Sequence, residues 1–194
     1  IIYRFIFDIR IFIYLRVRSS AVEHCLDTAG VTGSNPVVPT TKFKELFLKF
    51  NNMIYVYYML KCVFVATLIA SLIFLIIDII WLSFATKSFY RPLIGNLLTD
   101  KPVMWAAALF YILYVFGMAL VVIQPCVDSA SLFKTVYTGF IFGLVAYGTY
   151  NLTNMAVLKG WSPTVTFVDM FWGGSLTALS ATTGLYLAKK IVHY

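Results

Sequence analysis

Four long apolar runs constrain this chain more than any other feature of its sequence. All four lie after Met53, and they cover residues 63–84, 103–124, 133–158 and 164–187. The second run carries no charged residue, and each of the others carries one: Asp78, Lys134 and Asp169. A helix of about 20 residues crosses the roughly 30 Å hydrocarbon core of a bilayer. The sequence therefore predicts four membrane-spanning helices.

The runs are apolar on every side of a helix, which excludes helices at the surface of a soluble protein, since those keep a polar face. The composition of the chain, 61% hydrophobic and 12% charged, agrees with this. The connections between the runs are short, so neighbouring helices run antiparallel. We expect an all-α fold, an integral membrane four-helix up-down bundle, over residues 53–194.

Residues 1–52 do not fit this pattern. Residues 16–41, RVRSSAVEHCLDTAGVTGSNPVVPTT, are polar and rich in turn signals. Synonymous codons for them can be chosen so that the coding strand folds as a transfer RNA, with residues 33–36 encoding ggttcgaatcc in one stem-loop. We therefore expect residues 16–41 to be a translated tRNA gene and residues 1–15 and 42–52 to be its flanks, disordered if made. The protein's own start would then be Met53 or Met59; a genuine N-terminal arm is the alternative.

Two of the apolar runs contain an aspartate. A charge at the bilayer centre costs about 2.5–3.5 kcal/mol on insertion scales, so such residues are rare. Asp78 lies six residues before the end of the first run, and Asp169 five residues after the start of the fourth. Both of these ends belong to one membrane face. At 1.5 Å per residue, both carboxyls are expected roughly 8–9 Å beneath that face.

The end of the third run reaches the same level with the sequence AYGTYNLTNMAVLKGW. Its two asparagines are three residues apart and therefore share a helix face. Trp81 and Trp172 each follow an aspartate by three residues, so we expect each carboxyl to lie beside an indole. The sequence thus predicts a half-buried polar pocket, with Trp81 and Trp172 as its aromatic residues, formed by Asp78, Tyr147, Tyr150, Asn151, Asn154 and Asp169.

A pocket of this kind has a functional and a structural interpretation. It can bind a small polar solute, a lipid head group or a proton. Alternatively, its polar side chains hold the helices together, each contributing about 0.6–2 kcal/mol. The structural interpretation is the better one for the amides, whereas the two aspartates fit both interpretations equally.

Small residues indicate close packing of the third and fourth runs. Gly139 and Gly143 form a small-xxx-small pair, and Gly173 and Gly174 lie in the fourth run. The pattern predicts a close approach of two backbones. It leaves open whether that approach is internal or joins two subunits.

The sequence shows no pattern for a metal, a cofactor or a catalytic nucleophile, and nothing marks the chain as an enzyme. Seven of its fifteen lysines and arginines lie in residues 1–52, and no clustered basic face follows, so we expect no nucleic-acid binding. Cys62 and Cys126 lie at run ends on one face, and two separate thiols are favoured over a disulfide.

The strings GLVAYGTYNLTNMAVLKGW and TFVDMFWGG, with DIIWL and FYRPLIG before them, resemble the bacterial family of predicted integral membrane proteins DUF2177. The likeness covers roughly residues 59–189. It implies a multi-pass protein of the bacterial inner (cytoplasmic) membrane with four spans and no assigned activity. Asp78 and Asp169 match the family pattern, whereas Asn151 stands where that pattern has an acid. This departure weakens any mechanism that needs three carboxylates.

Two functions are compatible with these features. The first is a transport-like or small-ligand or lipid-binding protein that uses the polar pocket. The second is a structural membrane subunit whose glycine-rich helices pack on a membrane partner or on another copy of the chain. In both, the lipid bilayer is the surrounding partner. A membrane enzyme acting on lipid ranks third, because paired carboxylates can transfer protons but no nucleophile accompanies them.

Overall fold

The computed structural model describes residues 40–129 and 131–193, so the predictions for residues 1–39 lie outside the described residues. The chain divides into a unit that ends at Ile54 and a second unit, Tyr55–Tyr194, which contains all four predicted spans. The described residues form helices and no strands. The all-α prediction is therefore confirmed.

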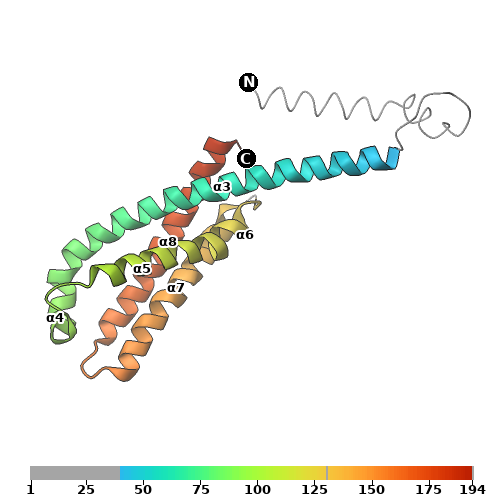
Figure 1. Ribbon diagram of the computed structural model, residues 1–194. Helices are drawn as coiled ribbons and strands as arrows, with labels where there is room; N and C mark the ends of the chain where they lie inside the picture. Colours follow the sequence, from blue (N-terminus) through green and yellow to red (C-terminus); the bar gives the residue numbers. More distant parts are fainter. Residues whose placement is uncertain (1–39, 130, 194) are drawn as a thin grey trace, which may run out of the picture. The chain divides into compact units, whose positions relative to one another are not determined.

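Four helical segments make up the bundle. They are α3 (Thr40–Ala85), then α5 (Met104–Met118) continued through η3 (Ala119–Ile123) and α6 (Gln124–Cys126), then α7 (Leu132–Val157), and finally α8 (Pro163–Val192). Successive segments run in opposite directions (Figure 1), which is the predicted up-down order. Between α3 and α5 lie the short elements η1 (Thr86–Tyr90), α4 (Arg91–Ile94) and η2 (Gly95–Leu97).

Residues 40–52 differ from the sequence prediction, which assigned disorder to them. They are helical and form the first turns of α3. The stretch KFKELFLKFNN contains no proline or glycine and consists mainly of residues that tolerate a helix well. Continuity with the long apolar part of α3 also removes the cost of starting a new helix.

Two prolines lie inside helical segments, and each follows a wide π-helical turn. Pro92 follows η1, and Pro125 follows η3. A proline ring clashes with the carbonyl four residues earlier, and a π-helical turn changes this spacing. The second run was predicted to end at residue 124, whereas the helix continues to Cys126 because η3 accommodates Pro125.

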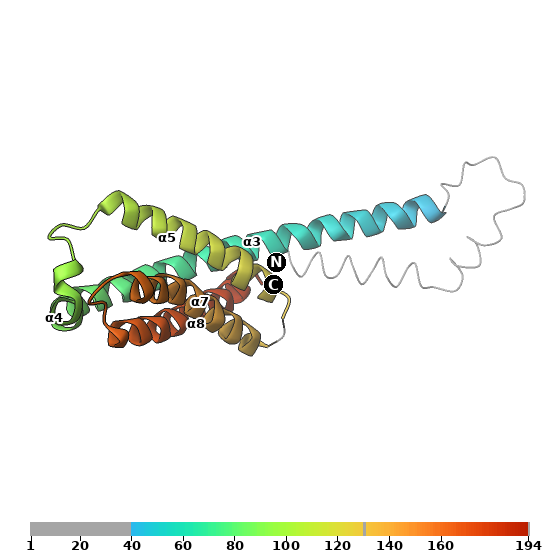
Figure 2. The same ribbon diagram turned by 90° about the horizontal axis from the view of Figure 1, so that it is seen from below.

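Helices α7 and α8 lie side by side (Figures 1 and 2) because glycines bring their backbones together. A Cβ atom on Gly143 would lie 2.2 Å from the Gly173 carbonyl oxygen, and one on Gly139 would lie 3.0 Å from the Ala178 Cα. Gly174 faces Phe140 in the same way, with 2.9 Å to the ring. The four predicted packing glycines therefore all lie in one interface inside the chain.

Helix α3 packs on α8 by similar means. A Cβ atom on Gly184 would lie 2.6 Å from the Ala66 carbonyl oxygen, so the backbone of α8 approaches that of α3 closely. Leu185 of α8 and Met118 of α5 are fully buried in the same core cluster as Ala66. A second, smaller core cluster contains Phe74, Tyr114 and Leu176 and leads toward the candidate site.

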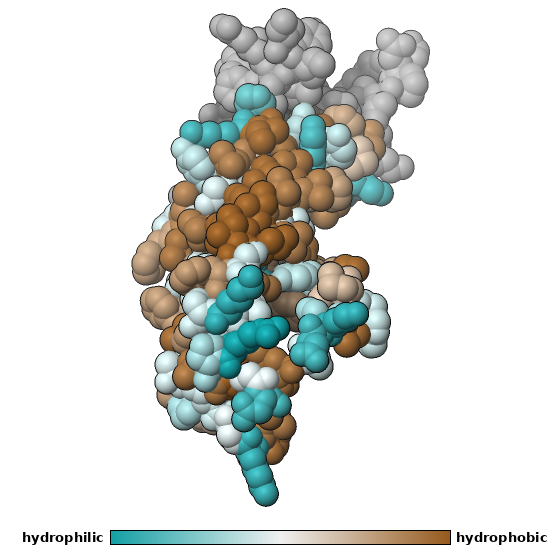
Figure 3. Space-filling model, turned by 90° about the vertical axis from the view of Figure 1, so that its left-hand side faces the viewer, coloured by the Kyte–Doolittle hydropathy of each residue, from teal (hydrophilic) through white to brown (hydrophobic). Residues whose placement is uncertain are grey.

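The outside of the bundle is apolar. Large hydrophobic side chains are exposed along α3 and α5, and hydrophobic residues cover much of the face in Figure 3, beside a group of hydrophilic ones. Two stretches, Glu45–Leu97 and Met104–Cys126, are long and apolar enough to cross a membrane, and only 22% of the most apolar part of each is buried. A core helix of a soluble protein would be buried instead, so these faces suit lipid.

Helices α7 and α8 have 26 and 30 residues. At 1.5 Å per residue they are about 39 and 45 Å long, which is enough to cross about 30 Å of hydrocarbon. They carry more glycine, serine, threonine and asparagine than α3 and α5, and most of these side chains face inward. Their lengths fit the predicted spans, and many of their small and polar residues are buried between helices.

Cys62 and Cys126 are both buried and are separate thiols. The prediction that they form no disulfide is confirmed. Both belong to the core cluster around Ala66 and Leu185, where they pack as small apolar side chains.

Candidate functional site

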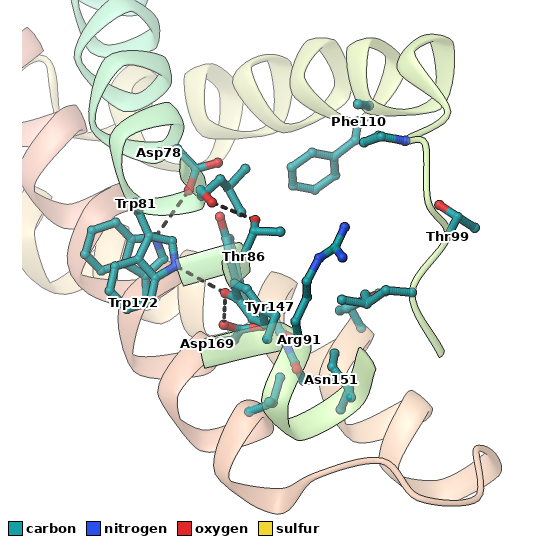
Figure 4. Close-up of a pocket in the computed structure, with 18 of the residues that line it drawn as sticks. Asp78, Trp81, Thr86, Arg91, Thr99, Phe110, Tyr147, Asn151, Asp169 and Trp172 are labelled. Atoms are coloured by element: carbon teal, nitrogen blue, oxygen red, sulfur yellow. Dashed lines mark hydrogen bonds between the residues drawn. The ribbon is translucent and has the colours of Figure 1, made fainter. Parts of the chain in front are cut away.

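Asp78 of α3 and Asp169 of α8 line the same pocket. Their side chains are largely withdrawn from solvent, with residue exposures of 5% and 8%. They are 91 positions apart in the sequence, and the antiparallel order of the helices brings them together. Figure 4 shows both carboxyls in this pocket.

Asp78 accepts two hydrogen bonds from other helices. The Tyr111 hydroxyl of α5 donates to its Oδ2 at 2.7 Å, and the Trp172 indole of α8 donates to its Oδ1 at 3.2 Å. Both donors are only partly buried. The carboxyl of Asp78 thus joins α3, α5 and α8 at one point.

Asp169 accepts its hydrogen bond from the segment after α3. The Tyr90 hydroxyl donates to Asp169 Oδ1 at 2.5 Å, and the Trp81 indole donates to the Tyr90 oxygen at 3.1 Å. Tyr90 is the last residue of the π-helical turn that precedes Pro92. The proline-dependent turn therefore helps to position the phenol that holds the second carboxyl.

The two indoles pair with the carboxyls in a different way from the one predicted from the sequence. Each tryptophan was expected beside the aspartate three residues before it. Instead, Trp172 of α8 binds Asp78 of α3, and Trp81 of α3 reaches Asp169 through Tyr90 (Figure 4). The two rings stack on each other with centroids 4.4 Å apart and planes 20° apart. The Trp172 N–H reaches across from α8 to α3, whereas the Trp81 N–H binds Tyr90 of η1, whose hydroxyl then reaches α8.

Three of the predicted α7 residues, Tyr147, Tyr150 and Asn151, also line the pocket. Asn151 is fully buried; its Nδ2 donates to the Tyr147 carbonyl at 3.1 Å, and its side chain also interacts with Asp169. The Oδ1 of Asn151 is buried without a hydrogen-bond partner. Tyr150 packs edge-on against Trp161 with ring centroids 5.9 Å apart.

Asn154 is the predicted residue that the structure does not bring to the pocket wall. Its backbone carbonyl accepts the hydrogen bond that ends α7, from the Leu158 amide at 2.9 Å. Its side chain interacts with that of Tyr150, which itself lines the pocket.

Sequence reasoning missed three residues of the site: Tyr90, Tyr111 and Arg91. Tyr90 was missed because the turn before Pro92 has no sequence signal of its own. Tyr111 did carry a signal, since a tyrosine within an uncharged run needs a partner for its hydroxyl. Arg91, an exposed residue of α4, extends into the space between α4 and Phe110 (Figure 4).

The pocket has a volume of about 610 Å³. Its polar groups are few, and aromatic rings make up much of its wall: Trp81, Tyr90, Phe110, Tyr111, Tyr147, Tyr150, Trp161 and Trp172. Among residues 40–129 and 131–193, no group of three or more histidines, cysteines or acids could hold a metal ion. The arrangement can hold a ligand by hydrogen bonds and aromatic contacts.

The chain matches the family model described as predicted membrane protein (DUF2177) over residues 53–186 and belongs to this family. That description assigns the family to the membrane and names no activity. Neither the comparison with curated proteins nor the comparison with solved structures found a match. The translation of a tRNA gene over residues 16–41 lies outside the matched range and stays a prediction.

Proposed function

We propose that this member of the DUF2177 family is a transport-like or ligand-binding protein of the bacterial cytoplasmic membrane. In this proposal, the pocket between α3, α4, α5, α7 and α8 binds a small polar solute or the polar head of a lipid. One observation carries the proposal: the two buried aspartates line a single pocket walled by aromatic rings, together with the fully buried Asn151, whose Oδ1 has no partner.

The size of the pocket supports binding over a purely structural role. Its volume of about 610 Å³ lies within the roughly 300–1,000 Å³ of small-molecule sites. Polar side chains that only hold helices together need contact with each other and no open space.

The alternative of a partner-binding subunit loses the residues on which it depended. Gly139, Gly143, Gly173 and Gly174 all pack within the α7–α8 interface of one chain, so they do not offer a close-approach surface to a partner. The exposed faces of α3 and α5 carry large apolar side chains, which suit lipid as well as protein. No observation favours a partner on these faces.

Filling the pocket tests the proposal. Ala107 lines the pocket, whereas its neighbour Ala106 is exposed on another side of α5. We expect Ala107→Trp to abolish a bound lipid or solute, because the indole would occupy the cavity, and Ala106→Trp to retain it. Full-length proteins purified in maltoside detergent are compared by native mass spectrometry for bound species.

The two variants carry the same added ring and differ only in the direction that it faces. The proposal is wrong if wild type, Ala107→Trp and Ala106→Trp retain the same bound species in the same amounts. A wild-type protein that carries no bound species, and acquires none from a total lipid extract, also contradicts it.

A further inference from the structure

We infer that the pocket accepts an ammonium group, and that the ligand carrying it is an amine-bearing amphiphile such as an ethanolamine phospholipid. This inference rests on the proposed function and names the class of ligand that the same site would take. It depends on the charges of the pocket, on its unused hydrogen-bonding capacity and on its aromatic wall.

The charge of the pocket is the first argument. Asp78 and Asp169 are both buried, and Asp169 interacts electrostatically with Asp78. Within the described residues, the groups that hydrogen-bond to the two carboxyls are phenols, an indole and an amide, with no lysine, arginine or histidine among them. Buried carboxylates are costly unless a positive charge pairs with them. A ligand cation would supply that charge.

Hydrogen-bonding capacity gives the second argument. The donors nearest the carboxyls already bind protein acceptors: Tyr111 and Trp172 donate to Asp78, Tyr90 donates to Asp169, and Trp81 donates to Tyr90. Arg91 and the Tyr147 hydroxyl also line the pocket as donors, and unused acceptor positions lie at the carboxyls. Asn151 Oδ1 has no partner, and an ionised carboxyl has about four acceptor positions, of which Asp78 uses two within the chain. A ligand group that uses these acceptor positions must donate, as an ammonium group does.

The aromatic wall is the third argument. Cations bind over the faces of tryptophan and tyrosine rings, and sites for ammonium groups combine such rings. Trp81 and Trp172 stack beside the two carboxyls, and Tyr147 and Tyr150 line the same pocket. A neutral or anionic head group would gain no cation–π attraction from these rings and would meet the two carboxyls.

The mouth of the pocket supports an amphiphile over a free amine. Arg91 extends into the pocket from α4, where its guanidinium suits the phosphate that follows the ammonium group in an ethanolamine head group. Leu82 and Leu98 line the same pocket and are 39% and 40% exposed, so they offer an apolar path for an acyl chain.

The tryptophans of the pocket allow a direct binding measurement. Three of the four tryptophans line it, and the fourth, Trp105, is 72% exposed. The full-length Trp105→Phe protein in maltoside micelles is titrated with lysophosphatidylethanolamine, with N-acetylated lysophosphatidylethanolamine, which lacks the charge, and with lysophosphatidylglycerol. We expect a saturable change in fluorescence with the amine lipid, and affinities lower by on the order of 30-fold for the other two lipids.

Single substitutions distinguish the contribution of the two carboxyls to lipid binding from that of Arg91. Asp78→Asn and Asp169→Asn should each remove the preference for the amine lipid, whereas Asp128→Asn, the same change at an exposed position in the turn before α7, should keep it. Arg91→Gln changes an exposed side chain of α4. This change should lower the affinity for lysophosphatidylethanolamine. It should leave the affinity for dodecylamine, which has no phosphate, unchanged. Ethanolamine alone tests a soluble source of the same group.

The outcomes distinguish this inference from the proposed function. The inference is wrong if all three lipids bind with equal affinity, or if the preference for the amine lipid survives both aspartate changes. In either case the proposed ligand-binding function still stands. Binding of none of the lipids and neither amine overturns the inference as well. Should the aspartate variants fail to fold, the comparison of charged with N-acetylated lipid on the parent protein still decides. If ethanolamine binds saturably and as tightly as the lipid, the inference that the pocket accepts an ammonium group stands. The inference that this group belongs to a lipid is then wrong.

Discussion

Gly143→Ala is expected to remove most of the folded protein from the membrane. The added methyl group would lie 2.2 Å from the Gly173 carbonyl oxygen, 2.7 Å from the Gly173 carbonyl carbon and 2.5 Å from Thr177 Oγ1. Non-bonded carbon atoms prefer separations of about 3.5–4.0 Å, so the helices must separate by more than an ångström. Backbone atoms cannot rotate away, and the collision cannot be relieved by a change of rotamer.

Separation of α7 from α8 at this point would also loosen neighbouring contacts. Gly173 packs against the Tyr147 ring, where a Cβ atom would lie 2.2 Å from the ring, and Tyr147 borders the pocket. Overpacking costs about 1–3 kcal/mol, and a collision between backbones belongs at the upper end. We therefore expect about 3 kcal/mol of lost stability and a melting temperature lower by roughly 6–12 °C.

Gly148→Ala is the matched control on the same helix. Its added methyl group would meet only the end of the flexible Met170 side chain, at 3.1 Å from Cε. Alanine is favoured over glycine in a helix interior by about 1 kcal/mol, so this variant should be as stable as the parent or more stable. Accumulation and thermal stability of fluorescent-protein fusions, measured by size-exclusion chromatography, compare the two. Equal behaviour of Gly143→Ala and Gly148→Ala would show that the α7–α8 contact is not as close as described.

The helices could be predicted from the sequence because their signal is local. Runs of apolar residues with one charge or none indicate their own helices, whatever they pack against. The same holds for the small-xxx-small pair of Gly139 and Gly143, which indicates a close approach. The partner of that approach could not be predicted, because a stripe of small residues has the same pattern within one chain and between two chains.

The site could be predicted only as far as helix depth determines it. Counting residues from the run ends placed Asp78 and Asp169 at one level, and both line one pocket. Hydrogen-bond partners depend instead on rotation of each helix and on side-chain direction. For that reason the indole of Trp172 was expected at Asp169 and lies at Asp78, and Tyr90 was missed because a π-helical turn before Pro92 determines its direction.

Asp78→Leu is expected to destabilise the bundle even though it removes a charged residue from an apolar helix. Insertion scales favour loss of the charge by about 2.5–3.5 kcal/mol. That gain applies to the inserted helix both before and after the helices pack, so most of it cancels from the free energy of unfolding within the membrane. What does not cancel is the loss of the acceptor for Tyr111 and Trp172.

Each buried donor left without a partner costs about 1–3 kcal/mol, and both donors here are only partly buried. We therefore expect Asp78→Leu to lower the free energy of unfolding by about 3 kcal/mol. Asp78→Asn should cost less, because its amide oxygen still accepts one of the two hydrogen bonds. Steric trapping of the unfolded state in the bilayer measures these differences in the free energy of unfolding.

Removal of the donors together with the acceptor tests the physical cause. If orphaned donors account for the loss, Tyr111→Phe and Trp172→Phe should each destabilise the protein alone but restore stability in the Asp78→Leu background, since replacing both partners of a hydrogen bond by apolar groups can be nearly neutral. We expect the triple variant to recover about half or more of the free energy of unfolding that Asp78→Leu loses. The interaction energy between Asp78 and its two donors then has the expected sign. A triple variant as unstable as the sum of its single changes would mean that Asp78 is not held by these two donors, and that its place in the pocket has another origin.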